Sequence, residues 1–313
     1  MNKKPVTPKA RKYAQDNRID ISRESGSGEF GAVLFSDIEN LKKKKATKLA
    51  ENMAAYYGIS LDSIDKKDGL IRKKDIEKIT NTAIVTPLAQ KRKVLAESIM
   101  KSLNSTAQFT VFSEMDTTEF ISAYRILKTA AAEKTGINIT LTDMLSYAVS
   151  RVLLTLPKFN SSVAANQVYS YNYVNLSLAV HCEDGVLAPV ILGADTLSLT
   201  ETAAQREELT ALTRNRMLTN DRLTGGTFTL SNLGNSQTTY FTPIINYPQS
   251  AILGVGRTDK KPAVINGEIT VRDFTYFSLT MDHFLLDGKD GANFFDELAS
   301  VLKSPADYYN IQR

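Results

Sequence analysis

Residues 277–288 join a predicted strand to a predicted helix and carry two ionisable side chains at the junction. Apolar and polar residues alternate from Phe277 to Met281, which predicts a β-strand. His283 and Asp287 follow, and Gly288 allows a sharp turn. Apolar residues then recur at helical spacing, as Phe294, Phe295, Leu298, Val301 and Leu302. A strand followed directly by an amphipathic helix predicts an α/β fold.

Histidine is scarce in this chain. There are two, His181 and His283, so a side chain that exchanges a proton near neutral pH is rare here. His181 lies on the more polar side of an alternating run, and we expect it to be an ordinary strand residue. For His283, the spacing alone allows both a structural histidine and a catalytic base. Two histidines without neighbouring carboxylate or cysteine ligands predict no metal site.

The composition is typical of a soluble globular protein. The 313 residues are 42% hydrophobic and 23% charged. No apolar run of roughly 20 residues occurs, so no transmembrane helix is expected. Polar residues follow Pro5, which argues against a secretory signal. The lone Cys182 suits a reducing compartment, and the expected location is therefore the cytoplasm.

The first 80 residues predict two small all-α modules in tandem, at residues 5–42 and 46–80. In the first module, Thr7 caps a short helix, and a glycine-rich loop precedes a second helix that starts at Phe35. The same layout returns about 40 residues later, which indicates a repeated unit, with a degenerate linker as the alternative. Residues 1–100 hold 21 Lys and Arg against 13 Asp and Glu, but a lysine run is more typical of a solvated linker, so no nucleic-acid partner is expected.

A linker at residues 81–90 is predicted to lead into a main domain at 91–307. Helices are predicted at 91–100, from Thr117 or Thr118 to Gly136, from Leu141 to Leu156, and at 197–212. Strands are predicted at 108–116, 174–181 and 185–191, and a further strand runs into a turn at 225–234. Gly225 and Gly226 are not followed by the Lys-Ser/Thr of a phosphate loop.

Several of these segments together resemble one family. Asp-His-x-x-x-Asp-Gly, at residues 282–288, resembles the active-site signature of the dihydrolipoamide acyltransferases, the core subunits of 2-oxo acid dehydrogenase complexes, and of the related chloramphenicol acetyltransferases. Residues 225–234 resemble the family's second signature, and residues 242–256 resemble the stretch that follows it. Residues 6–14 with 19–21 are similar to the family's peripheral subunit-binding domain. The family usually has Arg after the histidine, where this chain has Phe284.

The resemblance implies a chloramphenicol-acetyltransferase-like mixed-sheet core preceded by subunit-binding modules. It implies that His283 is the general base, that Ser231 is the oxyanion donor, and that Asp287 holds the active-site loop. It places Asn232 and Gly288 at the substrate. Arg11 and Lys12 fall in the module that docks partner subunits, whereas Gln15, Ala32, Glu51 and Leu70 stand where basic docking residues are expected.

The implied reaction is acyl transfer between two thiols. A thiol with a pKa near 8.5 needs a base to become a good nucleophile at neutral pH. The implied substrates are coenzyme A or acyl-CoA, and a dihydrolipoyl group. No segment carries the hairpin of a lipoyl domain, so the lipoyl group is expected on a separate carrier protein. The implied partners are the dehydrogenase or decarboxylase subunits of the complex, and a homotrimer or larger homo-oligomer in which the base and the oxyanion donor come from neighbouring subunits.

Two other functions remain open from the sequence. A non-catalytic scaffold subunit of a 2-oxo acid dehydrogenase complex would explain the missing basic docking residues and Phe284. An acyl-CoA transferase that acts on another small acceptor would need the same base and hydroxyl donor. The acyl group is also open, because acetyl, branched-chain and succinyl enzymes differ in pocket side chains.

Overall fold

The computed structural model describes residues 5–17, 19–21, 25–42, 45–64, 69–80, 87–182 and 185–309. The chain divides into two units, residues 1–87 and 88–313, and each is described by itself. Residues 81–86 of the predicted linker lie outside the described residues.

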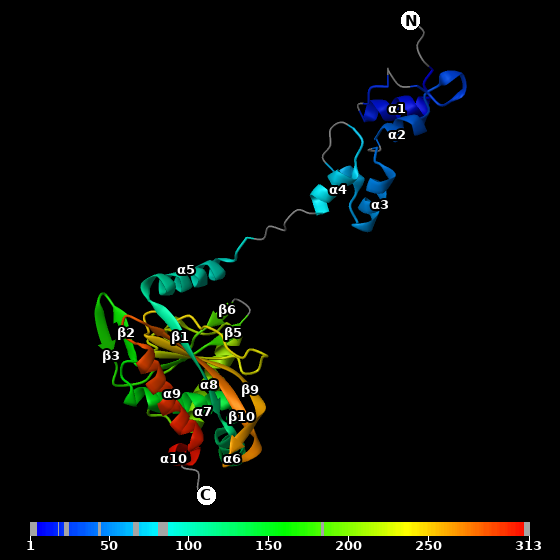
Figure 1. Ribbon diagram of the computed structural model, residues 1–313. Helices are drawn as coiled ribbons and strands as arrows, with labels where there is room; N and C mark the ends of the chain where they lie inside the picture. The colour runs from blue at the N-terminus through cyan, green and yellow to red at the C-terminus, as the bar shows by residue number, and fades with distance from the viewer. Residues whose placement is uncertain are drawn as a thin grey trace. The chain divides into compact units, whose positions relative to one another are not determined.

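The first unit contains two helical modules with the same layout (Figure 1). Their elements are α1 (Pro8–Asp16), η1 (Glu29–Gly31) and α2 (Phe35–Lys42), then α3 (Lys48–Tyr56), η2 (Leu61–Ser63) and α4 (Lys73–Thr80). Thr7 caps α1, as predicted, and Thr47 caps α3 in the same way, each by accepting a hydrogen bond from a backbone N–H. Each module packs a small core of its own, Ala10, Ala14, Val33 and Ile38 in the first and Ala50, Ala54, Ile64, Ile71 and Ile76 in the second.

The second unit is built on a six-stranded sheet, and this sheet is mixed, as the family resemblance implied. The strand order is β1-β10-β9-β8-β4-β7, with β1 (Gln108–Asp116), β4 (Leu176–Leu178), β7 (Val190–Ile191), β8 (Phe228–Asn232), β9 (Ala251–Ile265) and β10 (Glu268–Asp282). The β8 strand runs parallel to both of its neighbours, and the other pairs are antiparallel. Two small hairpins lie outside this sheet, β2 (Ser161–Ala164) with β3 (Gln167–Ser170) and β5 (Val180–Cys182) with β6 (Gly185–Leu187).

Some helices of this unit begin or end at clear local signals. They are α5 (Gln90–Ser105), α6 (Thr118–Thr135), α7 (Leu141–Thr155), α8 (Leu199–Arg214), η3 (Asn220–Leu223), α9 (Gly288–Lys303) and α10 (Pro305–Tyr309). Gly136 ends α6 in the left-handed conformation, with φ 71°. Thr140 with Asp143 and Ser198 with Glu201 form capping boxes that start α7 and α8.

The two faces of the sheet differ in chemistry. Residues paired across strands share a face, so Leu178, Leu230, Leu253, Leu279 and Val111 form one apolar row. This row packs in the main hydrophobic core with side chains of α7 and α9. The opposite face carries hydroxyl side chains, in rows that include Ser177 with Thr229 and Thr110 with Thr280. The predicted candidate Ser231 lies on this hydroxyl-bearing face.

Candidate active site

His283 lies in a turn directly after β10, at the predicted junction of strand and helix. Its backbone N–H donates to the carbonyl oxygen of Ala107 over 2.9 Å, and its ring packs against Phe109 with 4.5 Å between the ring centroids. The imidazole is exposed in the single chain. A base that must meet a thiol needs this access, because proton transfer requires contact within hydrogen-bond distance.

Asp287 forms the start of α9. Its Oδ1 accepts from the backbone N–H of Lys289 over 2.8 Å and of Asp290 over 3.0 Å, and the Asp290 carboxylate accepts from the Asp287 N–H in return. These hydrogen bonds, first that from Asp290, lower the pKa of Asp287, and a smaller contribution comes from His283. The carboxylate therefore stays ionised at neutral pH and fixes the end of the turn that holds His283.

The predicted sharp turn at Gly288 is wrong. Gly288 is the first residue of α9 and is not among the glycines with positive φ. The chain turns earlier, where the N–H groups of Leu285 and Leu286 both donate to the carbonyl oxygen of Asp282. The reason is that the capping box of Asp287 already starts the helix, so the next residue takes helical backbone angles.

Ser231 lies in a cross-strand row with Gly254 and Ser278. It is partly buried, near the end of β8. The ring of Phe241 covers Gly254 so closely that a methyl group there would lie 2.7 Å from a ring carbon. The Phe241 N–H also reaches the Ser278 hydroxyl over 3.4 Å. The Phe241 ring therefore packs against β9 next to Ser231.

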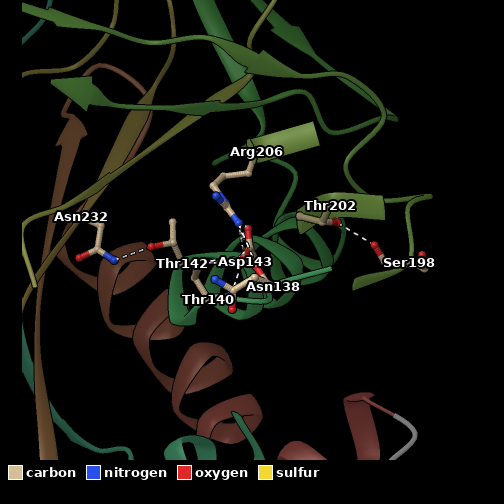
Figure 2. A network of polar contacts seen from close by, with 8 residues as sticks. All are labelled: Asn138, Thr140, Thr142, Asp143, Ser198, Thr202, Arg206 and Asn232. Atoms are coloured by element: carbon tan, nitrogen blue, oxygen red, sulfur yellow. Dashed lines mark hydrogen bonds and ion pairs between the residues drawn. The ribbon is translucent and has the colours of Figure 1, made fainter. Parts of the chain in front are cut away.

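Asn232 points to the other face of the sheet, where Figure 2 shows it directed at the start of α7. Its Nδ2 donates to the hydroxyl of Thr142 over 2.9 Å, and its Oδ1 accepts from the N–H of Gly234 over 2.7 Å. The amide, which the sequence assigned to substrate binding, thus makes internal hydrogen bonds at both ends. It also lines a cavity of about 810 Å³ together with Thr142, Arg206 and His181.

A buried ion pair next to this cavity was missed by the sequence reasoning (Figure 2). Arg206 of α8 donates to both carboxylate oxygens of Asp143, over 2.9 and 3.2 Å, and to the carbonyl oxygen of Asn138. The Asp143 side chain is completely buried, and its oxygens accept hydrogen bonds from Arg206 and from the N–H of Thr140 at the start of α7. The spacing of Thr140 and Asp143 was a readable capping signal, but no local pattern points to Arg206.

The structure does not bring Ser231 and His283 of one chain together. Ser231 is in register with Ser278 through Gly254, and His283 follows Ser278 by five residues. Two strand spacings and five residues of extended chain put the two backbones roughly 20 Å apart. A base and a hydroxyl donor that serve one reaction must both reach the same carbonyl group of the substrate. A single chain therefore does not supply both Ser231 and His283 to one substrate molecule.

The remaining candidates belong to other elements of the chain. Arg11 and Lys12 are exposed on α1, in the first unit. His181 lies in a strand, as expected, and is an exposed residue of β5 that also lines the cavity beside Asn232. Among the residues that the structure describes, no group of three or more His, Cys, Asp or Glu could hold a metal ion. In the same residues, no helix has both the length and the apolar composition needed to cross a membrane.

The curated relatives of the chain are acyltransferase components. The chain is 32% identical over 304 residues to the dihydrolipoyllysine-residue acetyltransferase component of the pyruvate dehydrogenase complex of Acholeplasma laidlawii. That match covers 96% of this chain and 54% of the relative, so the chain spans about half of the relative's length.

Solved structures have the same fold. One, described as the cubic core of the pyruvate dehydrogenase multienzyme complex, is 33% identical, with a TM-score of 0.69 over 72% of this chain and 94% of the other. A second, 34% identical with the same TM-score and coverage, comes from a study of the role of a serine, a histidine and an asparagine in the catalytic mechanism of Azotobacter vinelandii dihydrolipoamide acetyltransferase.

Residues 80–309 match the family described as 2-oxoacid dehydrogenases acyltransferase (catalytic domain). These residues contain the mixed sheet, Ser231 and His283. The chain therefore belongs to this acyltransferase family.

Proposed function

We propose that this chain transfers an acyl group, most simply acetyl, between coenzyme A and a dihydrolipoyl group. One observation carries the proposal. The serine, histidine and asparagine studied in the Azotobacter vinelandii enzyme are separated by the same numbers of residues as Ser231, His283 and Asp287. Asparagine is replaced by aspartate here, but the capping role of Asp287 suits either side chain, since both accept from backbone N–H groups.

His283 is proposed to remove the proton from the attacking thiol. The thiolate is the nucleophile, and an exposed imidazole at the end of β10 can accept the proton and return it to the departing thiolate. Attack on the thioester places negative charge on the former carbonyl oxygen. The Ser231 hydroxyl is proposed to donate a hydrogen bond to that oxygen, which stabilises the intermediate. No covalent acyl-enzyme is needed.

We propose that the complete site forms between two copies of this chain. Within one chain, Ser231 and His283 lie roughly 20 Å apart, so the base of one subunit must meet the hydroxyl of another. A head-to-tail contact of this kind closes into a ring, of which a homotrimer is the form that the sequence resemblance implies. The cubic core among the solved relatives supports a larger homo-oligomer.

The docking and carrier roles rest on the sequence alone. Arg11 and Lys12 are exposed, which suits a surface that binds the dehydrogenase or decarboxylase subunits. A lipoyl group on a separate carrier protein stays a prediction from the sequence.

Phe241 supports acetyl as the acyl group. Its ring occupies the space over Gly254, next to Ser231, and leaves less room for a branched acyl chain. We expect Phe241→Ala to raise kcat/KM for isobutyryl-CoA relative to acetyl-CoA by about tenfold or more, since each added methylene is worth about 10–200-fold in a fitted pocket. The matched control is Phe112→Ala, an aromatic residue on the same face but on β1. An unchanged ratio in Phe241→Ala would place the acyl pocket elsewhere.

The proposed function is tested with acetyl-CoA and free dihydrolipoamide. The purified protein should release coenzyme A only when both are present, and S-acetyldihydrolipoamide should form in equal amount. Coenzyme A release with another thiol or amine, but not with dihydrolipoamide, would favour transfer to a different small acceptor. No turnover with acetyl-, isobutyryl- or succinyl-CoA, from a folded oligomer, would favour the scaffold function.

A further inference from the structure

We infer that Asp282 is a positioning residue for His283, an inference that rests on the proposed function. Asp282 is the last residue of β10, and the residue is only 1% exposed although it carries a carboxylate. Buried carboxylates are costly unless they accept hydrogen bonds. The position of Asp282, directly before the proposed base, makes its hydrogen bonds part of the geometry of the site.

The Asp282 carboxylate stabilises the turn that contains His283 by accepting hydrogen bonds from the backbone. Its Oδ1 accepts from the N–H of Ala107 over 3.0 Å and from the N–H of Phe284 over 3.2 Å. The first bond joins the turn to the segment between α5 and β1, and the second spans His283 within the turn. Hydrogen bonds to a charged acceptor are stronger than those between neutral groups. The backbone on both sides of His283 is therefore fixed by one side chain.

The backbone of Asp282 and its neighbour complete the attachment. The Asp282 N–H donates to the carbonyl oxygen of Ser250 over 2.9 Å, and the Asp282 carbonyl accepts from the N–H groups of Leu285 and Leu286, each over 3.0 Å. The His283 N–H donates to the carbonyl oxygen of Ala107, so the backbone N–H and the carbonyl group of Ala107 both bind this turn. The turn cannot shift along β1 without breaking several of these bonds together.

This attachment also sets the direction of the imidazole. Phe109 lies two residues after Ala107 on β1 and packs against the His283 ring. The hydrogen bonds between Asp282 and Ala107 fix the turn relative to β1, and therefore fix the ring of His283 on that of Phe109. Without the carboxylate, Ala107 and Phe284 each lose an acceptor, and the turn is free to move the base away from the attacking thiol.

The test compares replacements of Asp282 that differ in their hydrogen bonds. Asp282→Ala removes the acceptor, and we expect kcat to fall about 10²-fold with the KM for acetyl-CoA unchanged, because a displacement of about 1 Å at a reacting group costs that much. Asp282→Asn keeps an acceptor oxygen at the same place and should recover most of kcat. Asp282→Ser is too short to accept from both N–H groups, and its kcat should lie between the two.

The controls separate positioning from loss of structure. Asp273→Asn makes a carboxylate-to-amide change in the middle of β10, where Asp273 pairs with Lys260, and should leave kcat unchanged. Variants are compared only if their melting temperature and oligomer size match those of the parent; if Asp282→Ala does not fold, Asp282→Ser is compared with Asp282→Asn. Equal kcat in all Asp282 variants, with His283→Ala inactive, would overturn this inference and leave the proposed function intact. An inactive parent protein would instead overturn the proposed function.

Discussion

Replacing His283 with alanine is expected to lower the rate of acetyl transfer from acetyl-CoA to dihydrolipoamide by about 10²–10⁴-fold, the usual contribution of a general base. The attacking thiol is mostly protonated at neutral pH, so the loss should appear in kcat. It should shrink as the pH rises toward about 8.5, where the thiol ionises without help. The measurement is a pH series of initial rates for the parent and the His283→Ala variant.

The chain offers a matched control for this experiment in its second histidine. His181→Ala removes the other imidazole, which is also exposed but belongs to β5 rather than to the turn after β10. Its rate should equal that of the parent at every pH. A His283→Ala variant that keeps the parent's rate and pH dependence would contradict the assignment of the base.

Replacing Ser231 with alanine is expected to lower kcat by about 10²–10³-fold, the cost of removing one oxyanion donor. The hydroxyl acts on charge that develops only during the reaction, so the KM for acetyl-CoA should change little. Steady-state rates over a range of acetyl-CoA concentrations separate the two constants.

Ser236→Ala is the control for this change. Ser236 lies in the turn after β8, where its hydroxyl donates to the carbonyl oxygen of Leu233, and its loss should leave kcat as it is. A Ser231→Ala variant with a raised KM and an unaltered kcat would show that the serine binds substrate rather than the charged intermediate.

Local signals were enough to predict many elements of the fold. The strand β1 has the predicted ends, Gln108–Asp116, because its apolar residues alternate between two clear boundaries. The helix α6 stops at Gly136, as expected from a glycine in the left-handed conformation. The mixed sheet was predicted from the family resemblance and is confirmed.

Of the long hairpin of β9 and β10, only the end of β10, at residues 277–281, was predicted as a strand. The β9 strand contains Gly254, Gly256 and Pro262, residues that weaken a strand signal. Backbone pairing with β10 along nearly its whole length keeps β9 extended in spite of these residues. Such pairing is a tertiary effect, so a local pattern in the sequence does not contain it.

The spatial arrangement of the candidate site could not be predicted from the sequence either. His283 and Asp287 could be placed at a strand-to-helix junction from their neighbours. The distance from Ser231 to His283 depends on β9 lying between their strands, which no local pattern reveals. The same holds for Phe241, whose ring lies over Gly254 only because the chain returns across β9.

The most direct test of the account mixes two inactive variants, His283→Ala and Ser231→Ala, by co-expressing them with different tags and purifying the mixed oligomers. If the base of one subunit meets the hydroxyl of the next in a homotrimer, each mixed ring keeps about one site in three with both residues intact, and about a third of the parent's activity returns. Mixing His283→Ala with the double variant should restore nothing. Mixed oligomers as inactive as either variant alone would contradict the account.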